Sequence, residues 1–168
     1  MTIETTILIV YYSKHGNTAK MAKLIARGVA SVPKANAVIR TVKPIGDEDF
    51  DNIDPIVSQE DLNNCDGLIL GSPARFGNMA APLKQFIDET GLQWFSGTLI
   101  DKPASVFTSS SSLHGGQETT LLTMMLPLLH HGMMVVGLPY SEKSLHVTES
   151  GGTPVSYTHL TLPTTPYV

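Results

Sequence analysis

The chain has 168 residues, which fits a single domain with a sizeable hydrophobic core. Apolar residues make up 42% and charged residues 15%, as in a globular protein rather than a disordered one. Because the net charge at pH 7 is −4 and Lys and Arg do not cluster, the composition argues against a nucleic-acid-binding protein.

The first apolar run, residues 7–12, is too short to span a membrane. It also lacks the basic flank and small-residue cleavage site of a signal peptide, so we interpret it as a buried strand and expect no integral membrane segment. Cys65 is the only cysteine, so no internal disulfide can form and a reducing cytoplasm is the expected compartment.

Short runs rich in Val and Ile then alternate with segments of helical period, which indicates an open parallel sheet with helices on both faces. Five strands are expected, at residues 7–12, 37–42, 67–71, 104–108 and 133–137. Helices are expected at 18–32, from about Pro82 onward, and at 117–131, with Gly132 capping the last. We expect mostly surface loop with a short helix at 46–61, and a loop at 91–102.

Ligands of such sheets bind outside the carboxyl ends of the strands. The loop at 13–18, Ser-Lys-His-Gly-Asn-Thr, follows the first strand and opens a helix, where free N–H groups favour an anion. Its spacing matches neither a nucleoside-triphosphate P-loop nor the dinucleotide fingerprint, so it fits a phosphate monoester. The alternative is an ordinary polar loop in which Thr18 caps the helix.

The loops after the third and fourth strands are also unusual. Residues 72–79 combine an arginine, an aromatic ring and a glycine, which suits the polar edge of a flat ring but also suits a simple turn. Residues 109–118 hold four consecutive serines and a glycine pair, which can follow a ring edge and a polyol chain without bulk. A flexible linker is the alternative there.

Two further features lie outside these loops. Trp94, the only tryptophan, is either a core residue or a stacking wall for an aromatic substrate. His130 and His131 end a helix, where imidazole is favoured. No metal site is expected, because adjacent helical residues diverge and no cluster of acidic or cysteine ligands accompanies them.

Three stretches together resemble the WrbA family: Gly-Ser-Pro-Ala-Arg-Phe-Gly-Asn-Met at 71–79, His-Gly-Gly-Gln-Glu at 114–118 and His-His-Gly-Met at 130–133. The likeness extends over about residues 5–154. It implies a flavodoxin-like fold, FMN as cofactor, NADH or NADPH as electron donor, a quinone as acceptor and a tetrameric assembly.

By position, the resemblance implies an FMN phosphate site at Ser13, Lys14, His15, Gly16, Asn17 and Thr18. It places Ala74, Arg75 and Phe76 at one edge of the flavin ring, and Ser109, Ser110, Ser111, Ser112, Leu113, His114 and Gly115 at the other. It implies that His130 reaches the flavin of a neighbouring subunit and that Trp94 lies over the site where quinone and nicotinamide bind in turn. His15 replaces a Tyr that often meets the nicotinamide, and Ala74 replaces a common Thr.

The predicted activity is two-electron reduction of a quinone by hydride transfer from NAD(P)H through FMN, with no side-chain acid or base. A flavodoxin-type electron carrier is the main alternative, although carriers usually dock through a strongly acidic face and −4 is mild. A phospho-acceptor receiver domain needs acidic residues at the end of the first strand, where Tyr11, Tyr12 and Ser13 stand instead.

The C-terminus departs from this pattern, because a doubly wound sheet needs a final helix after its fifth strand. Residues 153–168 have three prolines, five threonines and no charged side chain, which disfavours a helix. From residue 155 the likeness stops, and 155–164 resemble an in-frame translation of a transposase-type sequencing adapter. We therefore expect a flavodoxin-like domain at 1–154, a missing final helix, uncovered apolar sheet surface, and a non-native tail at 155–168 that is extended or irregular and poorly packed. A genuine tail used in oligomer contacts is the alternative.

Overall fold

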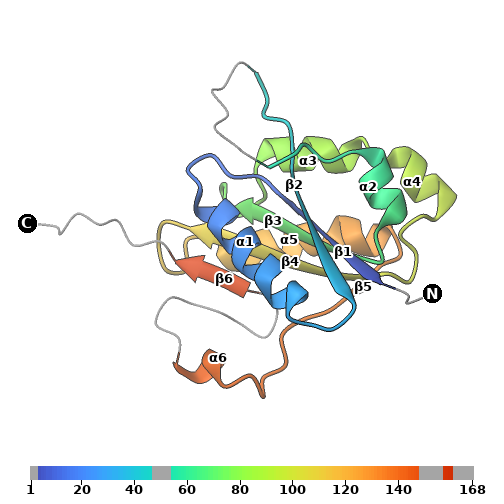
Figure 1. The fold of residues 1–168 in the computed structure, drawn as a ribbon. Helices are drawn as coiled ribbons and strands as arrows, with labels where there is room; N and C mark the ends of the chain where they lie inside the picture. The colour runs from blue at the N-terminus through green and yellow to red at the C-terminus, as the bar shows by residue number, and fades with distance from the viewer. Residues whose placement is uncertain (1–3, 47–53, 148–156, 161–168) are drawn as a thin grey trace, which may run out of the picture.

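The structure, a computed structural model, describes residues 4–46, 54–147 and 157–160. It contains a parallel sheet with helices on both faces (Figure 1). Five strands follow the order β2-β1-β3-β4-β5, the doubly wound order in which the chain reverses direction across the sheet beside β1. The predicted fold class is therefore confirmed.

The strands of this path are β1 (Thr5–Tyr11), β2 (Ala35–Thr41), β3 (Gly67–Pro73), β4 (Pro103–Ser110) and β5 (Met134–Val135). The fifth strand is shorter than expected, because its ladder joins only Met134 and Val135 to the start of β4 before the chain turns away toward Pro139. A sixth strand, β6 (Tyr157–Leu160), pairs in parallel with the end of β4.

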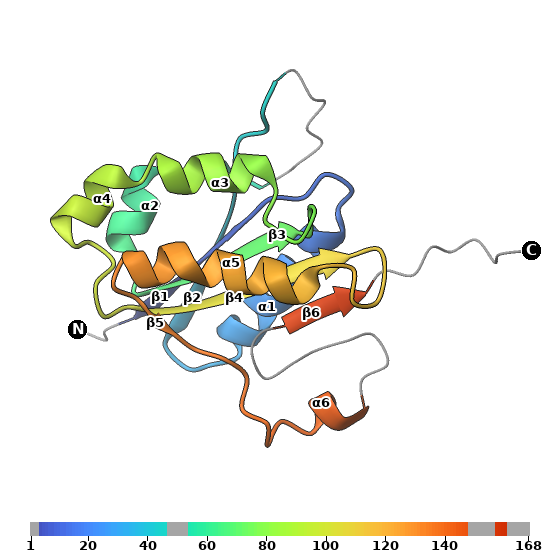
Figure 2. The same ribbon diagram turned by 180° about the vertical axis from the view of Figure 1, so that it is seen from behind.

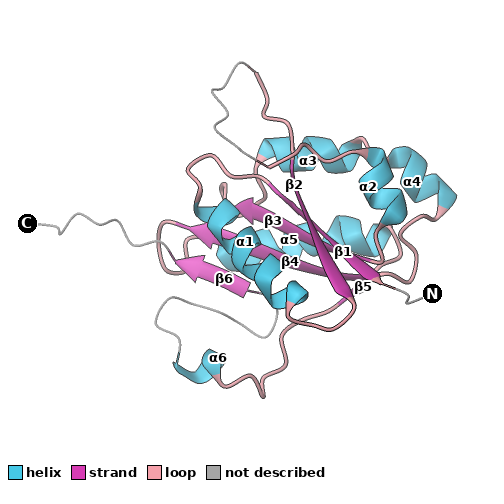
Figure 3. Ribbon diagram, in the orientation of Figure 1, coloured by secondary structure: helices cyan, strands magenta, loops and turns pink. Residues whose placement is uncertain are grey.

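The helices are α1 (Asn17–Ala30), α2 (Gln59–Asn64), α3 (Ala81–Asp88), α4 (Gly91–Ser96), α5 (Gln117–His130) and α6 (Ser144–Val147). α1 lies on one face of the sheet, and α3 and α5 lie on the other (Figures 2 and 3). Pro82 occupies the first turn of α3, and Gly132 follows α5 with a φ of 75°, both as predicted. In the described part of the chain, no helix is long and apolar enough to cross a membrane.

Residues that alternate along the strands pack into two separate hydrophobic cores, one on each face of the sheet. Ile9 and Tyr11 of β1 pack with Phe107 of β4 against α1, in a cluster that includes Met21. The Phe107 ring lies directly over Gly71, where a Cβ atom would come within 2.1 Å of Phe107 Cζ. The opposite core lies beneath α2, α3 and α5 and is the larger of the two.

Among the described residues, the face that carries α1 is incompletely covered near β5. Met134 and Val136 keep 54% and 51% of their surface exposed, whereas Val135, which points the other way, packs against the larger core. β6 is extended, as expected for the tail, but it pairs along the end of β4, which the expectation of a poorly packed tail did not anticipate. The rest of the tail and the proposed domain boundary at 154 lie outside the described residues.

One segment differs from the sequence prediction, and a second is described only in part. The expected loop at 91–102 is wrong for its first half, which forms α4 and ends at Gly97 in the left-handed region. The expected short helix of the acidic stretch at 46–61 is α2, which begins only at Gln59 and extends beyond the stretch to Asn64. Reciprocal hydrogen bonds between Ser58 and Asp61 cap its start. Residues 47–53 of that stretch lie outside the described residues.

Candidate functional site

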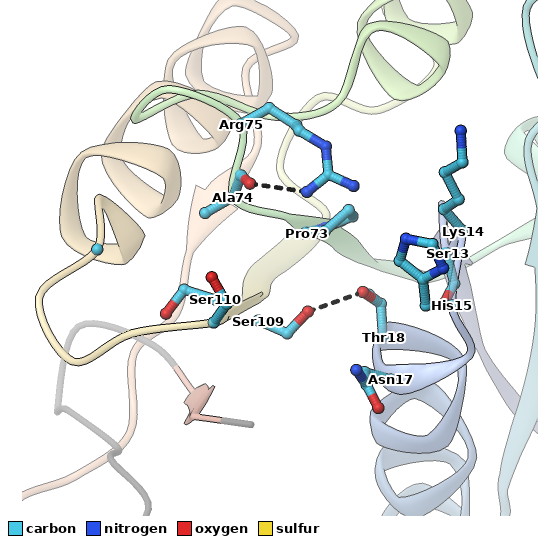
Figure 4. A pocket seen from close by; sticks show the side chains of 12 residues that line it. Ser13, Lys14, His15, Asn17, Thr18, Pro73, Ala74, Arg75, Ser109 and Ser110 are labelled. Atoms are coloured by element: carbon cyan, nitrogen blue, oxygen red, sulfur yellow. Dashed lines mark hydrogen bonds between the residues drawn. The ribbon is translucent and has the colours of Figure 1, made fainter. Parts of the chain in front are cut away.

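The loops after β1, β3 and β4 meet in one polar cleft at the carboxyl edge of the sheet, with a volume of about 150 Å³ (Figure 4). We call it the loop cleft. Its lining residues are Ser13, Lys14, His15, Asn17, Thr18, Pro73, Ala74, Arg75, Ser109, Ser110, Ser111 and Gly115. The three loops that the sequence singled out are thus brought together.

The floor of the loop cleft is built for an anion. Thr18 Oγ1 and Ser109 Oγ lie 3.0 Å apart, so the first turn of α1 is joined to the end of β4. Thr18 therefore does not cap α1; the cap position belongs to Gly16, with a φ of 81° and no side chain to cover the helix end. The buried Ser13 Oγ has no hydrogen-bond partner in the described part of the chain.

The wall of the loop cleft is basic. Lys14 and His15 line it from the β1–α1 loop, and Arg75 lines it from the β3–α3 loop. Arg75 Nη1 donates to Ala74 O at 3.0 Å, which uses one of five guanidinium protons. Because none of its described lining residues is Asp or Glu, the cleft favours anions in a chain whose net charge is −4.

The β3–α3 loop holds a tight turn. Arg75 and Asn78 exchange backbone hydrogen bonds of 2.8 and 3.0 Å, and both central residues have positive φ, 52° for Phe76 and 75° for Gly77. A β-branched or aromatic residue rarely adopts this conformation. Phe76 is fully exposed and does not line the loop cleft in a single chain.

The β4–α5 loop lines the cleft with its two ends and not with its middle. Ser109, Ser110, Ser111 and Gly115 face the cleft, whereas Ser112, Leu113 and His114 do not line it. His114 Nδ1 instead lies 2.6 Å from Glu118 Oε1. A backbone hydrogen bond at the start of α5 and the His114 ring together hold the pKa of Glu118 below its usual range.

A contact between two glycines joins the second and third loops. A Cβ atom on Gly116 would lie 3.1 Å from Gly77 Cα, and a Cβ atom on Gly77 would lie 2.7 Å from Thr119 Oγ1. Thr120 Oγ1 also lies 3.3 Å from Asn78 O. The loops therefore pack backbone to backbone, and a larger residue at either glycine would separate them.

The two remaining predicted residues, Trp94 and His130, lie elsewhere. They line a larger cleft of about 540 Å³ between α3, α4 and α5, which we call the helix cleft. Its lining residues are Asn78, Met79, Lys84, Ile87, Asp88, Thr90, Gly91, Trp94, Thr123, Leu126, Pro127, His130 and His131. The described lining residues of the two clefts do not overlap. α5 starts beside the loop cleft, and its 14 residues carry His130 roughly 20 Å away.

The sequence interpretation missed Pro73 in the loop cleft and most of the lining of the helix cleft, including Thr90 and His131. Pro73 lines the loop cleft, and its place directly after Ser72 at a strand end could have indicated this. Thr90 and His131 form a buried hydrogen bond of 2.9 Å beside the helix cleft, for which no local sequence signal exists. Among residues 4–46, 54–147 and 157–160, no group of three or more His, Cys, Asp or Glu is placed to hold a metal ion.

The family described as NADPH-dependent FMN reductase matches residues 5–143. The chain belongs to this family. A relative from Syntrophobacter fumaroxidans named NAD(P)H dehydrogenase (quinone) is 41% identical, with 94% of this chain and 84% of the relative aligned. A relative of the same name from Geobacter sulfurreducens is 44% identical over 80% of this chain and 72% of its own length.

Among solved structures, the FMN reductase family member described here is similar to a WrbA-like flavodoxin from Agrobacterium tumefaciens, with a TM-score of 0.69. The two are 24% identical, and the match covers 94% of this chain and 84% of the other, which shows the shared fold. The resemblance stated from the three sequence motifs is therefore confirmed at the level of family and fold.

Proposed function

We propose that the chain is an FMN-dependent NAD(P)H:quinone oxidoreductase. The observation that carries this proposal is the loop cleft, in which an anion-favouring floor and two glycine-containing loops converge at the switch point of the sheet. Membership of the FMN reductase family and the names of the relatives support it.

The residues of the loop cleft fit the phosphate of FMN. The unpartnered Ser13 hydroxyl costs free energy when buried alone, and a phosphate oxygen would accept a hydrogen bond from it. The first backbone N–H groups of α1, a helix of 14 residues, have no partner within the helix and also suit an anion. Hydroxyls and backbone donors of this kind favour a phosphate monoester over a larger pyrophosphate group.

The size of the cleft limits how much of the cofactor it encloses. Its 150 Å³ is below the roughly 300–1,000 Å³ of pockets that enclose a whole small molecule. We assign Ser13–Thr18 to the phosphate, and Ala74, Arg75 and Ser109–Ser111 to the ribityl chain and the nearer ring edge. When bound, FMN supplies the hydride and electron transfer, so the side chains bind and orient without acting as acid or base.

The second substrate site is proposed to form between copies of the chain. His15 lines the loop cleft, where it can stack on the nicotinamide of NADH or NADPH. Trp94 and His130 lie in the helix cleft and would reach a flavin only in a neighbouring copy. An exposed stripe on α5, formed by Leu122, Leu126 and Leu129, supports a homo-oligomer, and we propose a tetramer.

The compartment is proposed to be the cytoplasm. Cys65, the only cysteine, is buried, and burial raises the pKa of its thiol. A chain with one inaccessible thiol gains nothing from an oxidising environment, which favours a reducing compartment.

The deciding experiment combines flavin binding with turnover. Purified full-length chain is titrated with FMN and with riboflavin, and the absorbance spectrum shows which one is retained. NADH and NADPH are then oxidised in the presence of benzoquinone under anaerobic conditions. The proposal requires FMN retention and quinone-dependent oxidation of a nicotinamide; FMN retention without turnover would instead indicate an electron carrier. Light scattering measures the oligomeric state of the same sample.

A further inference from the structure

Thr90 stands at the junction between α3 and α4, with only 4% of its surface exposed. Its backbone N–H donates to Ile87 O at 3.0 Å, and its Oγ1 donates to the same carbonyl at 2.6 Å. The backbone N–H of Trp94 in turn donates to Thr90 O at 3.0 Å, so Trp94 lies one helical turn after Thr90. The position of Trp94 is therefore tied to that of Thr90.

The hydroxyl of Thr90 also fixes the protonation of His131. Thr90 Oγ1 lies 2.9 Å from His131 Nε2. A hydroxyl has one proton, and here that proton points to Ile87 O, so the hydroxyl must accept from a proton on His131 Nε2. His131 Nδ1 is buried and has no partner among the described residues, as expected for a neutral ring with its proton on Nε2.

A second hydrogen bond runs parallel to this one. Trp94 Nε1 donates to the carbonyl oxygen of His130 at 2.9 Å. Adjacent residues at the end of α5 therefore bind two residues of one helical turn at α4: His131 holds Thr90, and His130 holds Trp94. Together with the backbone bond from Trp94 to Thr90, they close a ring of three hydrogen bonds beside the helix cleft.

We propose that Thr90 and His131 are positioning residues for Trp94. Trp94 is 56% exposed, so its own hydrogen bond competes with water and holds the indole weakly. The Thr90–His131 bond is buried, is not exposed to that competition, and sets the distance between α4 and the end of α5. One consequence of this inference, that Thr90 and His131 set the affinity for the quinone, rests on the proposed function. The positioning of Trp94 does not.

The test uses the single tryptophan of the chain, whose fluorescence reports Trp94 alone. Thr90→Val keeps the shape of the side chain but removes the hydroxyl. Thr123→Val is the matched control, because Thr123 lines the same cleft but donates to Thr120 O. Thr90→Ser and His131→Gln keep a hydroxyl or a donor at the same place and serve as rescuing variants, whereas His131→Leu does not.

In full-length protein, acrylamide should quench Trp94 more efficiently in Thr90→Val and His131→Leu than in wild type, by up to the roughly twofold that its 56% exposure leaves open. Thr90→Ser, His131→Gln and Thr123→Val should stay close to wild type. Quenching in Thr90→Val equal to that in wild type or in Thr123→Val overturns the proposal.

A second measurement is made on the wild-type protein, and one variant is used only to assign its signal. Nitrogen-15 NMR of the wild-type histidines at neutral pH should show a neutral ring that carries a slowly exchanging proton on Nε2, and this signal should be lost in His131→Gln. Absence of such a ring overturns the proposal.

The kinetic consequence separates the two proposals. If the wild type reduces quinones, Thr90→Val should raise the quinone KM by about two- to tenfold while kcat stays within about twofold. An unchanged quinone KM overturns the role of the pair in substrate binding. If the wild type shows no quinone turnover, the proposed function fails, and the fluorescence and NMR results alone decide whether Thr90 and His131 position Trp94.

Discussion

Thr18 Oγ1 lies 3.0 Å from Ser109 Oγ, across 91 residues of chain. Both side chains are buried, and the bond ties the first turn of α1 to the end of β4 at the floor of the loop cleft. Two hydroxyls that share one hydrogen bond retain one further proton between them. That proton, together with the unpartnered Ser13 hydroxyl, gives the floor of the cleft two side-chain donors for a ligand.

Removing these donors should weaken the binding of FMN and leave the binding of riboflavin nearly unchanged. In Ser13→Ala/Thr18→Ala, the loss of hydrogen bonds to a charged phosphate should cost about 1.5–3 kcal/mol, which is roughly 10- to 150-fold in Kd. Fluorescence titration of both ligands measures the difference. Ser31→Ala, an exposed position at the other end of α1, is the control. An equal loss of affinity for FMN and riboflavin would show that the phosphate binds elsewhere.

Trp94→Ala should raise the quinone KM several-fold and leave FMN content nearly unchanged. Aromatic stacking contributes about 0.5–1.5 kcal/mol beyond area burial, which sets this magnitude. Steady-state kinetics per bound flavin measure the effect. Phe95→Ala is the matched control, because Phe95 is 86% exposed on the same helix and does not line the helix cleft. Loss of flavin with normal kinetics per flavin would mean that Trp94 is structural.

Two glycine substitutions should have opposite effects on stability. Gly71→Ala places a methyl group within 2.1 Å of the buried Phe107 ring, which should cost at least about 1–3 kcal/mol of unfolding free energy. Gly28→Ala, inside α1 with no atom within 4 Å of the new Cβ, should stabilise by about 0.5–1 kcal/mol. Urea unfolding measures both. Phe107→Leu should restore part of the loss in Gly71→Ala, and failure to do so would place the strain elsewhere.

The sequence predicted the parts of the molecule that depend on local pattern. The parallel sheet with helices on both faces and the convergence of three loops follow from the alternation of apolar runs and helical segments, since parallel strands place their carboxyl ends at one edge. The order of the strands depends on tertiary pairing and was not predicted from this pattern. The helix at the start of 91–102 was missed because Gly91 and Gly97 are typical of a loop. Only the tertiary fold places this helix, α4, against the end of α5.

The division of the predicted site into two clefts depends on tertiary geometry. Trp94 and His130 are 36 residues apart and meet only because α4 folds back onto the end of α5. Likewise, no periodicity indicates that His131 faces Thr90, since both are polar residues at helix ends that a sequence alone would assign to the surface.

Stability should fall as the pH drops below about 6.5. Burial and the neighbouring His130 lower the pKa of His131 below its ordinary value of 6.5. The unfolded chain therefore binds a proton at a higher pH than the folded chain, so the free energy of unfolding falls between those two pKa values, by at most about 1.4 kcal/mol per pH unit. Urea unfolding from pH 7.5 to 5.5 should show a smaller decline in His131→Gln than in wild type, whereas exposed His146→Gln should match wild type.

Covering the exposed part of the sheet face near β5 should increase the free energy of unfolding. Met134 and Val136 are about half exposed on the face that carries α1, although strands of a parallel sheet are normally covered on both sides. A designed amphipathic helix that replaces residues 155–168 should bury both side chains. Covering the exposed half of each should add about 1.5–3 kcal/mol to the free energy of unfolding, since full burial of one such side chain is worth about 1.5–3 kcal/mol. Urea unfolding and FMN retention of the two proteins measure the gain. The matched control is Met134→Ser/Val136→Ser in both backgrounds: it should cost more with the added helix than without it, because only there are the two side chains buried. An equal cost in both backgrounds, or no gain from the helix, would show that the helix does not pack on this face.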